Sequence, residues 1–129
     1  MKKKIIDILI TDDHPFFRRT LRALLQTRSD LKVVGEAENG QVAVRKAMEL
    51  SPDVVLMDVD MPVLGGIAAT RDIKKERSDT IVIALSNQSD ESYIQAMLNA
   101  GAADYILKSA KPTEIERSIR KAYSKRHPE

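Results

Sequence analysis

The chain has 129 residues, 43% of them hydrophobic and 31% charged, and it contains no cysteine. This length fits one domain, and the lack of cysteine excludes a disulfide scaffold, a thiolate metal site and a cysteine nucleophile. The net charge of +2 hides an uneven distribution. Residues 2–4 and 108–129 carry net charges of +3 and +4, so the body of the chain, residues 5–107, is acidic with a net charge of −5.

Short β-branched runs alternate along the chain with longer segments of helical period, and this alternation predicts strands and helices in turn. The predicted strands are Ile5–Thr11, Leu31–Ala37, Asp53–Asp58, Thr80–Ser86 and Ala103–Leu107. The predicted helices follow them. They are a stretch with Pro15 early and Phe17, Leu21, Leu24 and Leu25 on one face, a segment from the Asn39-Gly40 turn to about Leu50, Ile67–Glu76, a segment from a cap at Ser89 to a stop at Gly101, and one from about Thr113 onward.

Strands that alternate with helices predict an α/β domain whose parallel sheet is covered by helices on both faces. Five such units match the doubly wound, flavodoxin-like (βα)5 fold with a five-stranded parallel sheet in the order 2-1-3-4-5. In this order the first and third strands are neighbours, and ligands bind beyond their carboxyl ends. We expect the domain to span residues 1–125, with 126–129 as the start of a linker or C-terminal tail.

Polar side chains follow the predicted strands at the point where each strand ends. Asp12 and Asp13 follow the first strand, and Asp58 ends the third. Ser86 ends the fourth strand and Lys108 follows the fifth. Because the carboxyl ends of parallel strands meet at one edge of the sheet, three acids, a hydroxyl and an ammonium group are expected to lie together there.

This set of side chains suits one kind of chemistry. Three crowded carboxylates repel one another unless a positive charge neutralises them, and ligands that are all oxygen favour a hard cation, above all Mg²⁺. A carboxylate can attack phosphorus to form an aspartyl phosphate. Phosphoryl transfer needs Mg²⁺, a lysine and a hydroxyl around the transferred group. The strand ends therefore predict phosphoryl transfer to a carboxylate.

Four motifs resemble the receiver domain of bacterial two-component response regulators, and the resemblance extends over almost the whole chain. They are Asp12-Asp13 after the first strand, Met57-Asp58-Val59-Asp60-Met61-Pro62 with Gly65-Gly66, Ala84-Leu85-Ser86, and the segment from Ala100 to Lys108. Asp12-Asp13-His14-Pro15 and the helix after it are similar to the NarL/LuxR-type branch. Members of that branch usually carry a C-terminal helix-turn-helix domain, which is absent from this chain.

The resemblance implies a role for each acid. Asp58 would be the phosphoacceptor and a ligand of Mg²⁺. Asp13 would bind Mg²⁺ directly, and Asp12 largely through water. Asp60 would contribute its backbone carbonyl to the metal, so its own carboxylate would not be a ligand.

The resemblance also implies a switch. Ser86 would hydrogen-bond the phosphoryl group and Lys108 would pair with it, so that both take part in catalysis. Tyr105 would turn inward as Ser86 shifts. The face formed by the helix from Ser89 to Gly101, the last strand and the last helix would then change its arrangement and be recognised by a partner.

Three departures from the family pattern bear on these roles. Asn87 stands where the family often has Ala or Gly, which affects access to Asp58 and the rate of dephosphorylation. The common Lys-Pro pair is displaced to Lys111-Pro112, and Lys108 is preferred as the site lysine because it directly follows the strand. Ser86 replaces the commoner Thr and keeps the hydroxyl. His14 is interpreted as structural, close to the start of the first helix.

The predicted function is two-component signal transduction: acceptance of a phosphoryl group from a sensor histidine kinase, which controls an output domain or partner, most simply in transcription regulation. The chain would act as a signalling module rather than an enzyme, apart from its own phosphoryl transfer and autodephosphorylation. A homodimer could form on phosphorylation.

The basic cluster on the last helix, from Arg117 to Arg126, is interpreted as a solvated face, so no direct binding of nucleic acid is expected. No apolar run reaches the roughly 20 residues of a membrane span, and a cytoplasmic location is expected.

Two alternatives share the fold class. Asp58-Val59-Asp60 after an apolar strand also resembles the nucleophile motif of haloacid-dehalogenase-type phosphatases, in which the second Asp acts as acid and base. Pro62 stands where that motif expects Thr or Val, and the further metal-binding acids of that family come late in the chain rather than first. A flavodoxin-like flavin carrier is disfavoured by the lack of tryptophan and of a hydroxyl-rich phosphate loop after the first strand.

Overall fold

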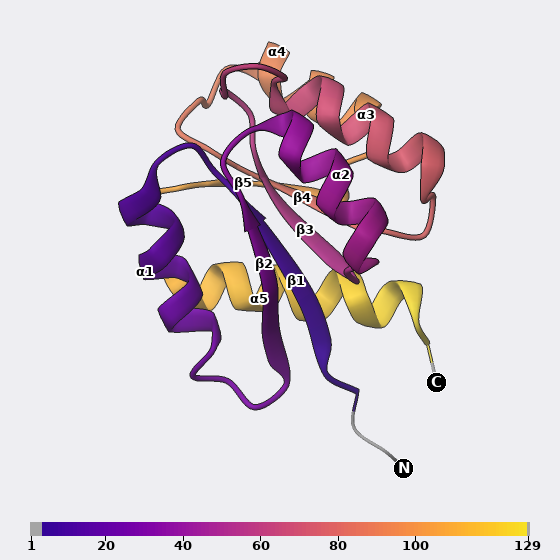
Figure 1. Cartoon of the computed structure of the whole chain (residues 1–129). Helices are drawn as coiled ribbons and strands as arrows, with labels where there is room; N and C mark the ends of the chain where they lie inside the picture. Colours follow the sequence, from indigo (N-terminus) through magenta and orange to yellow (C-terminus); the bar gives the residue numbers. More distant parts are fainter. Residues whose placement is uncertain (1–3, 129) are drawn as a thin grey trace.

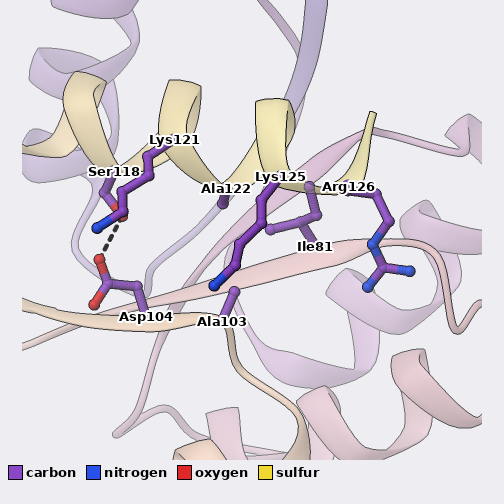
Figure 2. A pocket seen from close by; sticks show the side chains of 8 residues that line it. All are labelled: Ile81, Ala103, Asp104, Ser118, Lys121, Ala122, Lys125 and Arg126. Atoms are coloured by element: carbon purple, nitrogen blue, oxygen red, sulfur yellow. Dashed lines mark hydrogen bonds between the residues drawn. The ribbon is translucent and has the colours of Figure 1, made fainter. Parts of the chain in front are cut away.

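The computed structural model describes residues 4–128, which form one parallel sheet covered by helices (Figure 1). The strands are β1 (Ile6–Thr11), β2 (Leu31–Ala37), β3 (Val54–Asp58), β4 (Ile81–Ser86) and β5 (Asp104–Leu107). All neighbouring strands pair in parallel, and their order is β2-β1-β3-β4-β5. The predicted fold class and strand order are therefore confirmed.

Helices lie on both faces of the sheet. They are α1 (Pro15–Leu25), α2 (Gly40–Leu50), α3 (Gly66–Glu76), α4 (Glu91–Ala100) and α5 (Pro112–Arg126). Figure 1 shows α1 and α5 on one face, and α2, α3 and α4 on the other. The helix α5 runs through Arg126, and the division of the chain at residue 125 stays a prediction.

Two hydrophobic cores fix this arrangement, one on each face of the sheet. Side chains alternate along each strand, so Ile8 and Ile10 of β1 pack toward α1 and α5, while Leu9 between them packs toward α2, α3 and α4. The central strands β3 and β4 are buried along their whole length. Burial on both faces explains why these strands are continuous apolar runs rather than alternating ones, and it holds their carboxyl ends in a fixed position.

The start of α4 differs from the prediction. The helix begins at Glu91, with Asp90 as its N-cap residue, rather than at a cap formed by Ser89. The preceding loop uses its backbone groups elsewhere: the Gln88 N–H donates to the Ser86 hydroxyl at 2.9 Å, and the Gln88 carbonyl accepts from the Tyr105 hydroxyl at 2.7 Å. These contacts hold Gln88 in the loop, and α4 begins one residue later than a cap at Ser89 predicts.

A strained turn lies between Asp58 and α3. The Leu64 N–H donates to the Pro62 carbonyl at 2.8 Å, which gives Val63 a φ of +70°. A β-branched residue is disfavoured in this left-handed region by about 1–2 kcal/mol. The Val63 side chain is 73% exposed, so it adds little packing to offset the strain.

Replacing Val63 with asparagine should therefore raise the free energy of unfolding by about 1 kcal/mol, because asparagine tolerates this backbone conformation. Chemical denaturation of the wild type and the variant would measure the change. Val63→Thr is the matched control, since it stays β-branched and should gain nothing. An equal gain in both variants would show that backbone strain is not the cause.

Candidate functional site

The acidic cluster lies where β1 and β3 end side by side. Thr11 of β1 pairs with Met57 of β3, so Asp12, the residue after β1, lies next to Asp58, the last residue of β3. Carboxylate oxygens of Asp12, Asp13 and Asp58 and a ring nitrogen of His14 all lie within 4.8 Å of one another. The structure thus brings together the three acids that the strand ends predicted.

Lys108 supplies the positive charge at this cluster. Its Nζ atom lies 2.7 Å from Asp12 Oδ2 and 3.2 Å from Asp58 Oδ2, and its side chain is 8% exposed. The Lys108 N–H donates to the Ser86 carbonyl at 2.9 Å, which fixes the start of the side chain just beyond β5. The Lys108 ammonium also lies 4.9 Å from the centre of the Phe17 ring. Lys111 instead precedes α5 and is exposed.

The electrostatics of the cluster are set by burial and by repulsion. Burial, with the nearby Asp12 carboxylate, raises the pKa of Asp58 from 3.8 to about 6, although Lys108 opposes the shift. Burial alone would lower the pKa of Lys108, but its contacts with Asp12 and Asp58 outweigh burial and raise it. Lys108 therefore stays an ammonium ion, and one cation faces three acids. The site is short of positive charge.

The carboxyl ends of β4 and β5 are connected through the loop before α4. Ser86 is 1% exposed, and its hydroxyl accepts from the Gln88 N–H. Tyr105 of β5 is half-buried against the core beneath α2, α3 and α4, and its hydroxyl donates to the Gln88 carbonyl. Gln88 therefore connects the two hydroxyl groups, so a movement of Ser86 would disturb the hydrogen bond that Tyr105 makes to Gln88.

Asp60 lies apart from the acidic cluster. Its carboxylate accepts a hydrogen bond of 3.0 Å from the Gln88 side-chain amide, and the residue is exposed. The role expected of Asp60 is to bind the metal through its backbone carbonyl, and this role stays a prediction. The Gln88 contact was not predicted, because the two residues are 28 positions apart in the sequence.

His14 lies closer to the acidic side chains than its predicted structural role at the start of α1 requires. Its Nδ1 atom is 3.1 Å from one oxygen of Asp12 and 3.1 Å from one oxygen of Asp13, while its side chain is 65% exposed. It is also the N-cap residue of α1, and its N–H donates to Asp12 Oδ1 at 2.9 Å. The structural role of His14 stays a prediction, and the structure adds to it a contact with the acids.

The donor set fits a magnesium ion. Asp13 Oδ1 is buried and accepts no hydrogen bond from any residue in the described part of the chain, 4–128, although the ring nitrogen Nδ1 of the exposed His14 lies 3.1 Å from it. The acids offer only oxygen ligands, which suit Mg²⁺ better than a metal that prefers nitrogen or sulfur. An unsatisfied buried oxygen beside two further carboxylates is what a hard cation would neutralise.

Comparison with known proteins identifies the family. The sequence pattern of the response regulator receiver domain matches residues 8–120. The chain belongs to the response regulator receiver domain family. This assignment supports neither the phosphatase alternative, with Asp58 and Asp60 as its catalytic pair, nor the flavin carrier. It places the chain among signalling receivers rather than classical enzymes.

Curated relatives of this receiver domain include regulators from several bacteria. It is 43% identical over 118 residues to the transcriptional regulatory protein LiaR of Bacillus subtilis, an alignment that covers 92% of this chain and 56% of LiaR. It is 39% identical over 120 residues to the response regulator UvrY of Escherichia coli, covering 93% of this chain and 55% of UvrY. The chain thus spans just over half the length of these relatives.

Solved structures show the same fold. The response regulator domain of Thermotoga maritima CheB superposes with a TM-score of 0.88 and 36% identity, covering 94% of this chain and 98% of that chain. The signal receiver domain of a NarL response regulator from Mycobacterium tuberculosis gives a TM-score of 0.90 and 28% identity, with the same coverage. The predicted similarity to the NarL/LuxR-type branch is confirmed. Within residues 4–128, no helix is long and apolar enough to cross a membrane.

Proposed function

We propose that this receiver domain accepts a phosphoryl group on Asp58, in a reaction that requires Mg²⁺, from the phosphohistidine of a sensor kinase. The observation that carries the proposal is the Asp58 carboxylate itself, which is 5% exposed and lies 3.2 Å from the Lys108 ammonium, beside two further acids. In the transfer, an oxygen of Asp58 forms a bond to phosphorus while the bond between phosphorus and the histidine nitrogen breaks. Mg²⁺, when bound, supplies charge neutralisation to the transferred group.

The roles of the chain's own residues follow from their positions. Asp13 and Asp58 would hold Mg²⁺ directly, Asp12 largely through water, and Asp60 through its backbone carbonyl. Lys108 would keep its contact with Asp12 and pair with a phosphoryl oxygen. Charge-assisted partners of this kind are short and strong, so the ends of β4 and β5 would be drawn toward the modified Asp58.

The output would pass through Ser86 and Tyr105. A phosphoryl oxygen is a stronger acceptor and carries more charge than the groups that Ser86 contacts in this structure, so the Ser86 hydroxyl would turn toward it and release the Gln88 N–H. The loop before α4 and the Tyr105 hydroxyl would then rearrange. The face made of α4, β5 and α5 would present this change to a partner, a second copy or an output domain, in keeping with the longer regulators to which the chain is similar.

The decisive test is phosphoryl acceptance from a small donor. Incubation with Mg²⁺ and acetyl phosphate should increase the intact mass by one phosphoryl group, and the product should be stable in acid and labile in base. Chelation of Mg²⁺ should prevent the gain. A protein that instead releases inorganic phosphate steadily from simple phosphomonoesters, with no covalent product, would contradict the proposal and favour a phosphatase.

The hydrogen bond of Tyr105 gives a separate prediction for the switch. Replacing Tyr105 with phenylalanine keeps the ring but removes the donor to the Gln88 carbonyl, so the amide protons of residues 87–90 should exchange several-fold faster. The rate of phosphoryl acceptance should stay within about two-fold of wild type, because the hydroxyl contacts none of the reacting groups. Tyr93→Phe is the control and should leave exchange in this loop unchanged. Unaltered exchange in Tyr105→Phe would show that this hydrogen bond does not hold the loop.

A further inference from the structure

Arg18 of α1 connects the acidic cluster to the edge strand β2. Its side chain is 17% exposed. One nitrogen, Nη1, donates to the main-chain carbonyl of Asp12 at 2.5 Å, while Nε donates to Glu36 Oε1 at 3.0 Å. Arg18 therefore contacts the residue that precedes Asp13 in the cluster, but through the backbone rather than through a carboxylate.

Glu36 is held firmly in the position that aims Arg18. Its second oxygen accepts from Arg22 Nη1 at 2.7 Å, and its main-chain carbonyl accepts from Lys46 Nζ at 2.5 Å. The hydrogen bond from Arg22 and that from Arg18 outweigh burial and lower the pKa of Glu36, so this carboxylate is ionised at neutral pH. A planar guanidinium between a fixed carboxylate and a carbonyl has little freedom to move.

Both backbone polar groups of Asp12 are consequently connected to β2 by hydrogen bonds. Its N–H donates to the Ala37 carbonyl at 3.0 Å, and its own carbonyl accepts from Arg18, which Glu36 orients. With both groups held, the direction in which the Asp12 side chain leaves the backbone is restrained, and its oxygens contact His14 Nδ1 and Lys108 Nζ. The same fastening determines where the chain continues into Asp13.

We propose that Arg18 is a positioning residue for the magnesium site, acting through the Asp12 backbone and anchored by Glu36. This inference rests on the proposed function, because it assigns Arg18 to the geometry of that same site. Its guanidinium meets Asp12 only at the main-chain carbonyl, so Lys108 remains the cation that faces the three carboxylates. Removal of a residue that orients a metal ligand typically lowers metal affinity 10–100-fold. We expect the affinity for Mg²⁺ to fall about ten-fold when Arg18 is replaced.

Arg22 provides a matched control. Both arginines lie on α1 and contact the same carboxylate, but Arg22 reaches only Glu36, whereas Arg18 also reaches Asp12. Arg18→Gln and Arg22→Gln each remove one charged bond to Glu36, and Arg18→Gln also removes the bond to the Asp12 carbonyl, so its melting temperature should fall further. Arg18→Lys keeps the charge but not the forked geometry, and it serves if Arg18→Gln fails to fold.

The test compares Mg²⁺ binding by isothermal titration calorimetry in these variants. Arg18→Gln should raise the Kd for Mg²⁺ about ten-fold, Arg18→Lys should raise it by an intermediate factor, and Arg22→Gln should stay within about two-fold of wild type. Equal Kd values for Arg18→Gln and Arg22→Gln, or an Arg18→Lys variant equal to wild type, would overturn the inference.

A measurement without metal separates this inference from the proposed function. The Asp12 amide proton donates to Ala37, and its exchange should become at least ten-fold faster in metal-free Arg18→Gln but not in Arg22→Gln. If wild type binds no Mg²⁺ while this difference is seen, the proposed function fails and the positioning of Asp12 by Arg18 stands. If exchange is the same in both variants, Arg18 does not position Asp12.

Discussion

Replacing Asp58 with asparagine should abolish phosphoryl acceptance and yet make the metal-free protein more stable at pH 7.5. The first effect follows because the amide cannot act as the nucleophile. The second follows from crowding: Asp58 is buried beside Asp12, and the repulsion is only partly relieved by Lys108. Asparagine has nearly the same shape and carries no charge, so this repulsion is lost.

The pH dependence gives the size of the second effect. In the folded protein the pKa of Asp58 is raised from 3.8 to about 6, so the folded state binds more protons than the unfolded state between these values. The contribution of Asp58 to the stability of the wild type should therefore be largest below about pH 4. This contribution should be lost as the pH rises through about 6. The loss should be on the order of 3 kcal/mol.

Thermal melts in chelator at pH 5 and pH 7.5 would measure this loss. The difference in melting temperature between Asp58→Asn and wild type should be larger at pH 7.5 than at pH 5. Saturating Mg²⁺ should raise the melting temperature of the wild type at pH 7.5 more than that of the variant. A gap between the two proteins that does not change with pH would contradict the raised pKa.

Replacing Lys108 with methionine should destabilise the metal-free protein by about 3 kcal/mol at pH 7.5, because removing the cation leaves buried carboxylates without a partner. The 2.7 Å contact with Asp12 and the 3.2 Å contact with Asp58 would both be lost. The pKa of Asp58 should rise further, since burial and Asp12 would then act unopposed. Lowering the pH to about 5.5 should recover much of the lost stability through protonation of Asp58.

Lys111→Met is the control for this prediction, because Lys111 is exposed and lies at the start of α5. It should leave stability and phosphoryl acceptance close to wild type. Lys108→Met should still accept the phosphoryl group, but the phosphorylated protein should show no change in the α4, β5 and α5 face by amide exchange. Equal stability of the two lysine variants, or an unchanged response of that face, would contradict the role proposed for Lys108.

The fold and the acidic cluster could be predicted because both follow from local pattern. Alternation of strands and helices determines a parallel sheet, and the order of such sheets places the first and third strands together. Asp12, Asp13 and Asp58 then meet because each directly follows or ends one of these strands. Lys108 was predicted on the same ground, since it is the first residue after β5.

The contacts that orient the site could not be predicted, because they join side chains whose directions depend on tertiary packing. Arg18 and Glu36 are 18 residues apart, and Gln88 and Asp60 are 28 apart. In the sequence, Arg18 is one of several charged residues on an amphipathic helix. The helical spacing of these residues does not distinguish Arg18 from Arg19 or Arg22. The hydrogen bond from Tyr105 to Gln88 joins β5 to the loop before α4 in the same way.

The central claim is that Asp58 is the residue that takes the phosphoryl group, and borohydride trapping tests it most directly. After incubation with Mg²⁺ and acetyl phosphate, borohydride reduces an aspartyl phosphate to homoserine, and peptide mass spectrometry locates the change. We expect the reduced residue at position 58 in the wild type, and no reduced residue in Asp58→Asn. A trapped residue at Asp12, Asp13 or Asp60, or none at all in the wild type, would contradict the claim.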